Sequence, residues 1–106
     1  MTEPPGIWII DPTGKTVFAN ERMADILGVS VSDMVGQDSF VYVYPEDQER
    51  AEKLFDRKRN RDSSPFEFKL RRSDGSSVRV HAQGTPMHDS GGAFLGIVGT
   101  FSPITK

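Results

Sequence analysis

SPFEFKLRRSDGSSVRVHAQG, residues 64–84, is the stretch that decides the fold. Apolar and polar residues alternate on both sides of residues 73–75, and a period of two is typical of strands with one buried face. A two-residue loop would place Leu70 opposite Arg79 and would mix the two faces. A three-residue loop places Leu70 opposite Val78, with Gly75 in the left-handed region that suits glycine. The stretch therefore predicts a hairpin with one continuous apolar face.

Another hairpin is predicted at the start of the chain, followed by helices. Residues 6–10 form a wholly apolar run, residues 11–14 read Asp-Pro-Thr-Gly as in a type I turn, and residues 15–19 supply a second strand. A run that is apolar on both faces favours a central strand. Asn20 can cap a helix over residues 21–27, and Gly28 can end it. Residues 30–36 then suggest a short helical turn.

Pro45-Glu46-Asp47 opens the longest predicted helix, because proline and acidic residues favour a helix start. Its apolar stripe, which also includes a lysine, indicates a helix that lies on a sheet; the stripe comprises Ala51, Leu54, Phe55 and Lys58. After Pro86 we expect a loop over residues 87–92 and a last strand over residues 93–101. The order of elements indicates an α+β domain with its helices grouped on one face of a single sheet.

The bulk composition describes one domain and excludes several kinds of chemistry. A chain of 106 residues can bury one core, and a net charge of -2 does not indicate nucleic acid or an anionic membrane as partner. The absence of cysteine excludes disulfides, thiolate metal sites and a cysteine nucleophile. No apolar run approaches the length of a membrane span. The acidic residues fall at turns and helix starts, where capping explains them, so we expect no catalytic site and no metal site.

Across nearly its whole length the chain resembles a PAS domain. The resemblance is carried by the Asp11-Pro12-Thr13-Gly14 turn, the Pro45-Glu46-Asp47 helix start and the block from Glu67 to Gly75, together with Asn20, Gly28, Gly36, Pro86, Asp89, Gly92, Gly96 and Gly99. It implies a five-stranded antiparallel sheet in the spatial order 2-1-5-4-3, with helices that enclose a pocket on one face. One departure is Pro103, which stands where the family often has an aspartate before the output helix.

The pocket wall is expected from the apolar face of the hairpin and the residues that could cover it. Ala82 and Gly84 are small and adjacent on that face, which favours a cavity over a filled core, although a filled core is the alternative. No inward polar side chain is evident, so the ligand should be largely apolar or held by backbone groups. The candidate pocket residues are Ile26, Leu27, Phe40, Leu54, Phe55, Phe68, Leu70, Val80, Ala82 and Gly84.

The outer face of the sheet is expected to be polar on the third and fourth strands and apolar on the first, second and last. The last strand presents either Phe94 and Val98 or Leu95, Ile97 and Phe101 outward, and the first presents either Trp8 or its neighbours. An apolar half-sheet marks an interaction surface. We predict that a second protomer covers this face in a homodimer, with Trp8, Phe18, Phe94 and Val98 at the interface; a flanking helix outside this sequence is the alternative.

No cofactor is expected. The flavin-adduct and thioester photoreceptors of the PAS superfamily need a cysteine, which this chain lacks. The family's haem proteins usually take a histidine from the long helix, where none occurs here. His81 shares parity with the polar face and His88 is expected in a loop. The basic cluster of residues 57–61 could bind phosphate, but a solvated helix end explains it better.

The resemblance implies a regulatory module of a larger signalling protein. We expect a tail over residues 1–5, the PAS domain over residues 6–102 and the start of a linker over residues 103–106. The implied role is a cytoplasmic sensor module with an output domain in the same chain, most simply a histidine kinase of a two-component system. The alternatives are a ligand-free dimerisation module, or the PAS domain of a diguanylate cyclase or phosphodiesterase.

Overall fold

The structure is a computed structural model that describes residues 4–104. Its elements, in chain order, are β1 (Gly6–Ile10), β2 (Thr16–Ala19), α1 (Glu21–Leu27), α2 (Val31–Met34), η1 (Ser39–Tyr42), η2 (Pro45–Asp47), α3 (Gln48–Arg59), β3 (Pro65–Arg71), β4 (Ser77–His88) and β5 (Phe94–Pro103). The tail expected over residues 1–5 and the linker expected over residues 103–106 lie partly outside the described residues.

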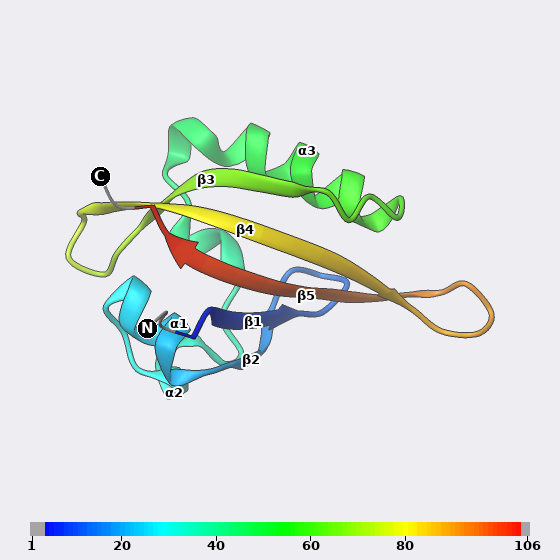
Figure 1. Cartoon of the computed structure of the whole chain (residues 1–106), viewed down its shortest axis with the longest axis horizontal. Coiled ribbons are helices and arrows are strands. Elements are labelled where there is room, and N and C mark those ends of the chain that lie inside the picture. The colour runs from blue at the N-terminus through cyan, green and yellow to red at the C-terminus, as the bar shows by residue number, and fades with distance from the viewer. Residues whose placement is uncertain (1–3, 105–106) are drawn as a thin grey trace.

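The five strands form one antiparallel sheet in the order β2-β1-β5-β4-β3, as predicted. The helices share one face of this sheet, α1 beside β1 and α3 across β4 and β5. Figure 1 shows β4, β5 and their connecting loop projecting beyond the other strands. The fold is thus an α+β sheet whose second face carries no helix within residues 4–104.

The hairpin of β3 and β4 has the predicted register. Leu70 lies opposite Val78, and Phe68 lies opposite Val80. The loop is the three-residue one, because the amide of Arg72 donates to the carbonyl of Ser76 at 2.8 Å and Gly75 has φ +90°. One continuous buried face runs along both strands.

The second half of this hairpin is longer than the sequence suggested. β4 continues through Pro86 to His88, where a loop was expected, and β5 extends to Pro103. Proline removes one hydrogen-bond donor and is tolerated at a free edge. Beyond Gln83, which pairs with Pro65 at the start of β3, β4 pairs only with β5, so Pro86 disrupts no second ladder.

The first hairpin contains an irregularity that changes its faces. Ile9 pairs with Phe18 but Ile10 pairs with Thr16, which leaves Val17 as an extra residue. As a result Thr16 and Ala19 are buried while Val17 and Phe18 are 52% and 46% exposed. The amide oxygen of Asn20 then caps α1 by accepting from the backbone N–H of Met23 at 2.9 Å, as predicted.

Candidate functional site

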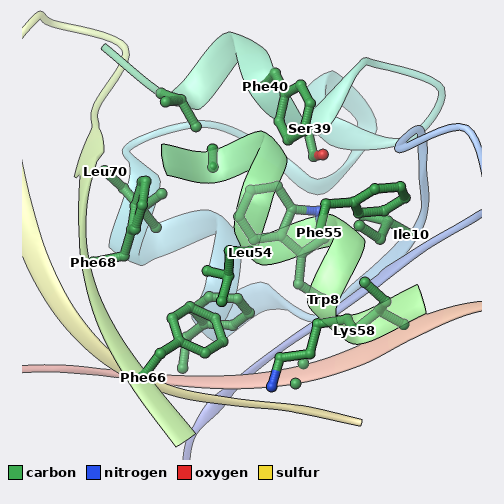
Figure 2. Close-up of a pocket in the computed structure, with 16 residues that line it drawn as sticks. Trp8, Ile10, Ser39, Phe40, Leu54, Phe55, Lys58, Phe66, Phe68 and Leu70 are labelled. Carbon is green, nitrogen blue, oxygen red and sulfur yellow. The ribbon is translucent and has the colours of Figure 1, made fainter. Parts of the chain in front are cut away.

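A cavity of about 110 Å³ lies between α3, η1 and the inner face of the sheet (Figure 2). Nearly all of its surface is contributed by carbon atoms, and its wall is formed by residues of β1, η1, α3, β3, β4 and β5 and by Val43 after η1. The lining residues are Trp8, Ile10, Ser39, Phe40, Val43, Ala51, Leu54, Phe55, Lys58, Phe66, Phe68, Leu70, Gly84, Ile97, Gly99 and Phe101.

One wall of the cavity is the apolar stripe of α3. Ala51, Leu54, Phe55 and Lys58 recur at helical spacing, so all four face the sheet. The Phe55 ring meets the Phe40 ring edge-on at a centroid distance of 6.2 Å. This contact ties the middle of α3 to η1, which forms the adjoining wall.

The opposite wall combines aromatic rings with glycines. The Trp8 ring packs on Phe101 at 5.5 Å and on Tyr42 at 5.7 Å between centroids. Gly84 faces the cavity, where a Cβ atom would lie 3.2 Å from Cε of Lys58. Because Gly84 has no side chain, the side chain of Lys58 has room to lie over this part of the sheet.

Lys58 is the polar group that sequence reasoning missed in the pocket. Its side chain is buried, with 2% of the residue exposed, although no inward polar residue was expected. Nζ donates to the carbonyl oxygen of Ser64 at 2.6 Å and lies 5.3 Å from the centroid of the Phe66 ring. Burial lowers the pKa of the Lys58 ammonium, partly opposed by the charge of Asp62. The sequence contained a signal for this inward position, because Lys58 falls on the apolar stripe of α3.

The rest of the basic cluster does not form a shared anion site. The guanidinium of Arg59 lies 4.8 Å from the centroid of Phe94 and donates to the carbonyl oxygen of Pro12 at 3.1 Å. Arg57 is exposed at the helix end. The basic residues at the end of α3 are therefore neither a phosphate site nor simply a solvated helix end, because the side chains of Lys58 and Arg59 pack against aromatic rings.

Six of the ten candidate pocket residues line the cavity: Phe40, Leu54, Phe55, Phe68, Leu70 and Gly84. The other four, Ile26, Leu27, Val80 and Ala82, do not, and are each at most 3% exposed in filled core. Ile26 and Leu27 belong to α1, which packs closely on β1: a Cβ atom on Gly6 would lie 2.8 Å from Sδ of Met23. That end of the inner face is filled, and the cavity lies at the α3 end.

Two of the four predicted interface residues, Trp8 and Phe94, face the helices and not the outer side of the sheet. Trp8 is only 6% exposed, and its indole Nε1 donates to Oγ1 of Thr16 at 2.8 Å on the inner face. Phe94 also faces α3, with its ring 5.9 Å from Phe55. It cannot share a face with Val98 because Gly96, at φ +129°, and a register shift interrupt β5 between them.

Phe18 and Val98 do lie on the outer face. Phe18 on β2 and Val98 on β5 are both paired with Ile9 of β1, and directly opposed residues share a face of the sheet. Ile9 and Val98 are half-buried, and Phe18 is more exposed. The row Phe18, Ile9, Val98 is called the outer apolar row below. Farther along the sheet the outer face becomes polar, with exposed Gln83 and His81 on β4.

The two histidines occupy different settings. His81 is exposed on the polar side, as parity predicted, whereas His88 ends β4 instead of lying in a loop and stacks on Phe94 at 5.5 Å. Within residues 4–104 no three His, Cys, Asp or Glu side chains are grouped so that they could hold a metal ion. In the same range no helix has the length and apolar character needed to cross a bilayer.

Two curated proteins match most of this chain. The C4-dicarboxylate transport sensor protein DctS of Rhodobacter capsulatus is 30% identical over 101 residues, which is 91% of this chain and 15% of DctS. The uncharacterized protein y4lL of Sinorhizobium fredii is 28% identical over 104 residues, which is 97% of this chain and 13% of y4lL. The chain therefore spans about a seventh of the length of these relatives.

Solved structures agree on the fold. The crystal structure of a PAS domain from Colwellia psychrerythraea has a TM-score of 0.87 at 20% identity, covering 95% of this chain and 86% of that one. A family model described as PAS fold matches residues 2–104. With the strand order, the capped helices and the cavity beneath α3 already established, this match shows that the chain belongs to the PAS family.

Proposed function

We propose that this PAS sensory domain binds a small, mainly apolar ligand in its interior and passes the bound state to an output domain of the same polypeptide. As a PAS domain it is a sensory module and not an enzyme. The observation that carries the proposal is the cavity of about 110 Å³ with carbon-rich walls between α3 and the sheet. Well-packed interiors contain few voids larger than a water molecule, so a cavity of this size favours a ligand.

Ligand binding would act through the packing of α3 on the sheet. The guanidinium of Arg50 lies 4.8 Å from the centroid of Phe68 and donates to the carbonyl oxygen of Glu67 at 3.0 Å. A ligand that prefers one arrangement of these contacts shifts the population toward it, by as much as its affinity differs between the two. We expect this shift to be relayed along β5, which leads to the C-terminal end of the domain.

The proposed setting is the cytoplasmic part of a sensor protein, with a histidine kinase as the output domain. The match to DctS, a transport sensor protein, supports a signalling setting. A diguanylate cyclase or phosphodiesterase output is the alternative. We propose that the domain works without haem or covalently attached flavin, the latter because the chain has no cysteine.

Native mass spectrometry of the gently purified chain, followed by titration with toluene as a neutral probe, tests ligand sensing. A co-purifying mass, or toluene binding that shifts the amide signals of cavity residues such as Leu54 and Phe68, supports the sensor. If the chain carries no extra mass and neither toluene nor the slimmer hexanamide changes those signals, the interior is not a ligand site. The ligand-free dimerisation module then becomes the better description.

A second copy of the chain is the proposed partner for the outer apolar row. An exposed apolar patch on an otherwise polar sheet favours such a contact, and Phe18 is 46% exposed there. In sedimentation experiments Phe18→Glu should convert dimers to monomers. Gln83→Glu, on the polar part of the same face, should leave the dimer intact. A monomeric unsubstituted chain, or equal effects of both substitutions, would contradict this dimer.

A further inference from the structure

The unusual group in the cavity wall is Lys58, a buried cation that forms no ion pair with the part of the chain that the structure describes. Among residues 4–104, no carboxylate oxygen lies within 4.0 Å of Nζ of Lys58, whereas Lys53 and Lys69 both have such partners. Asp62, whose charge acts on Lys58, uses its Oδ1 to accept from the N–H and the hydroxyl of Ser64. Among the described residues Lys58 thus has one acceptor, the neutral carbonyl of Ser64, for an ammonium with three donors.

A buried charge is normally paired, because removal from water without a counter-charge is costly. Two features favour the cavity as the place where a counter-charge could bind. Lys58 is itself a lining residue, and its side chain crosses Gly84 to reach the rim beside Phe66 (Figure 2). An anionic head group at this end of the cavity would accept the ammonium's remaining hydrogen bonds.

The remaining lining defines the other end of the ligand. Apart from Lys58, the only described lining residue whose side chain has a hydroxyl, carboxyl, amide or charged group is Ser39. A second negative charge would therefore meet hydrocarbon and stay unpaired, which excludes dicarboxylates and phosphate esters with a second charged group. One charged head and an apolar body fit this lining.

We infer that the pocket binds a small monocarboxylic acid as its carboxylate, with Lys58 as the partner of the head group. This inference rests on the proposed ligand-sensing function and names its ligand class. A cavity of about 150 Å³ is known to accept the six carbons of benzene, so one of about 110 Å³ suits a smaller body of about four or five carbons. Hexanoate is a suitable probe, and hexanamide is its neutral match in size.

The experiment compares these probes by calorimetry and by amide chemical shifts. A hydrogen-bonded charge contributes more than a neutral bond, so hexanoate should bind about tenfold or more tightly than hexanamide. Succinate should not bind in the cavity. Lys58→Met keeps the length of the side chain and removes the charge, and it should abolish the preference while retaining hexanamide binding. Arg57→Met, which removes an exposed charge one residue away, should keep the preference.

The outcomes separate the head-group inference from the proposed function. If toluene and hexanamide bind in the cavity but hexanoate binds no better, or if Lys58→Met keeps the preference, the carboxylate assignment is wrong and the sensor pocket stands. If hexanoate shifts only surface signals near Arg57, its binding is adventitious and the assignment is also wrong. If none of the three probes binds in the interior, both proposals are overturned. Since the first comparison uses the unsubstituted chain, it is informative even if Lys58→Met fails to fold.

Discussion

Thr16→Val tests whether Trp8 is fixed in the pocket wall. The indole Nε1 of Trp8 donates to Oγ1 of Thr16 at 2.8 Å, and the two residues are 6% and 1% exposed. Valine has nearly the shape of threonine but offers no acceptor. The substitution therefore leaves a buried N–H group without its partner and creates little or no cavity.

The expected loss follows from the burial of both groups. A buried donor deprived of its acceptor loses the free energy of its former contact with water, about 1–3 kcal/mol. For a domain of this size each kcal/mol lowers Tm by roughly 4–8 °C. Urea denaturation followed by fluorescence measures the loss directly, because Trp8 is the only tryptophan of the chain.

Thr85→Val is the matched control. Thr85 is exposed on the outer face, opposite Val98, so the same chemical change should alter the free energy of unfolding by less than about 0.5 kcal/mol. On a Trp8→Phe background, Thr16→Val should cost much less, as followed by circular dichroism. A Thr16→Val protein as stable as the unsubstituted one, or a Trp8 emission typical of water-exposed indole, would refute the inward position of Trp8.

Three further predictions concern stability. Lys58→Met should raise the free energy of unfolding at pH 7 by ~1–2 kcal/mol, because it removes a buried charge. Burial lowers the pKa of Lys58 in the folded state, so the charge opposes folding at any pH below that lowered pKa. The stability gained by the substitution should therefore shrink as the pH rises toward 10.5, the ordinary pKa of lysine. A constant gain across that range would contradict the buried charge. Arg61→Gly should stabilise the fold by ~1 kcal/mol, because Arg61 has φ +73°, a left-handed conformation that strains any residue other than glycine. Asn60→Gly, at φ -93°, should destabilise it. Equal urea midpoints for the two variants would show that Arg61 is not strained. Hydrogen bonds from Thr13, Ser64 and Ser76 lower the pKa values of Asp11, Asp62 and Asp74, respectively. The stability that these three carboxylates contribute is present above the ordinary aspartate pKa of 3.8 and is lost as the pH falls through the lowered pKa values. Asp74→Asn should therefore flatten this acid dependence of the urea midpoint.

Local signals in the sequence were sufficient for most of the framework. The register of β3 and β4 follows from parity and from the need for a left-handed glycine at Gly75, both of which act within one hairpin. The caps of α1 follow from Asn20 and Gly28 in the same way. These features depend on neighbours within a few residues, so a single sequence contains the information.

The errors arose where distant segments decide the outcome. β1 is apolar on both faces, so its pattern gives no preference for Trp8 inside or outside; the inward position is held by the hydrogen bond to Thr16 and by packing on Phe101, which lie on other strands. Phe94 was misplaced because the interruption at Gly96 changes parity in β5. Lys58 was overlooked because a charged residue at a helix end is usually solvated, and only the hollow at Gly84 lets it run inward.

The two halves of the inner face differ in how they could respond to a ligand. At the α1 end, Met23 and Leu27 have no exposed surface, and Gly6 permits direct contact between strand and helix. At the α3 end the helix faces a cavity and is held to the sheet and to the β1–β2 turn by Arg50, Lys58 and Arg59. A ligand can enter the second half by exchanging these few polar contacts, whereas the first half would have to open a filled core. We therefore expect amide exchange and chemical shifts to change along α3 and β3 on binding, with α1 unaffected.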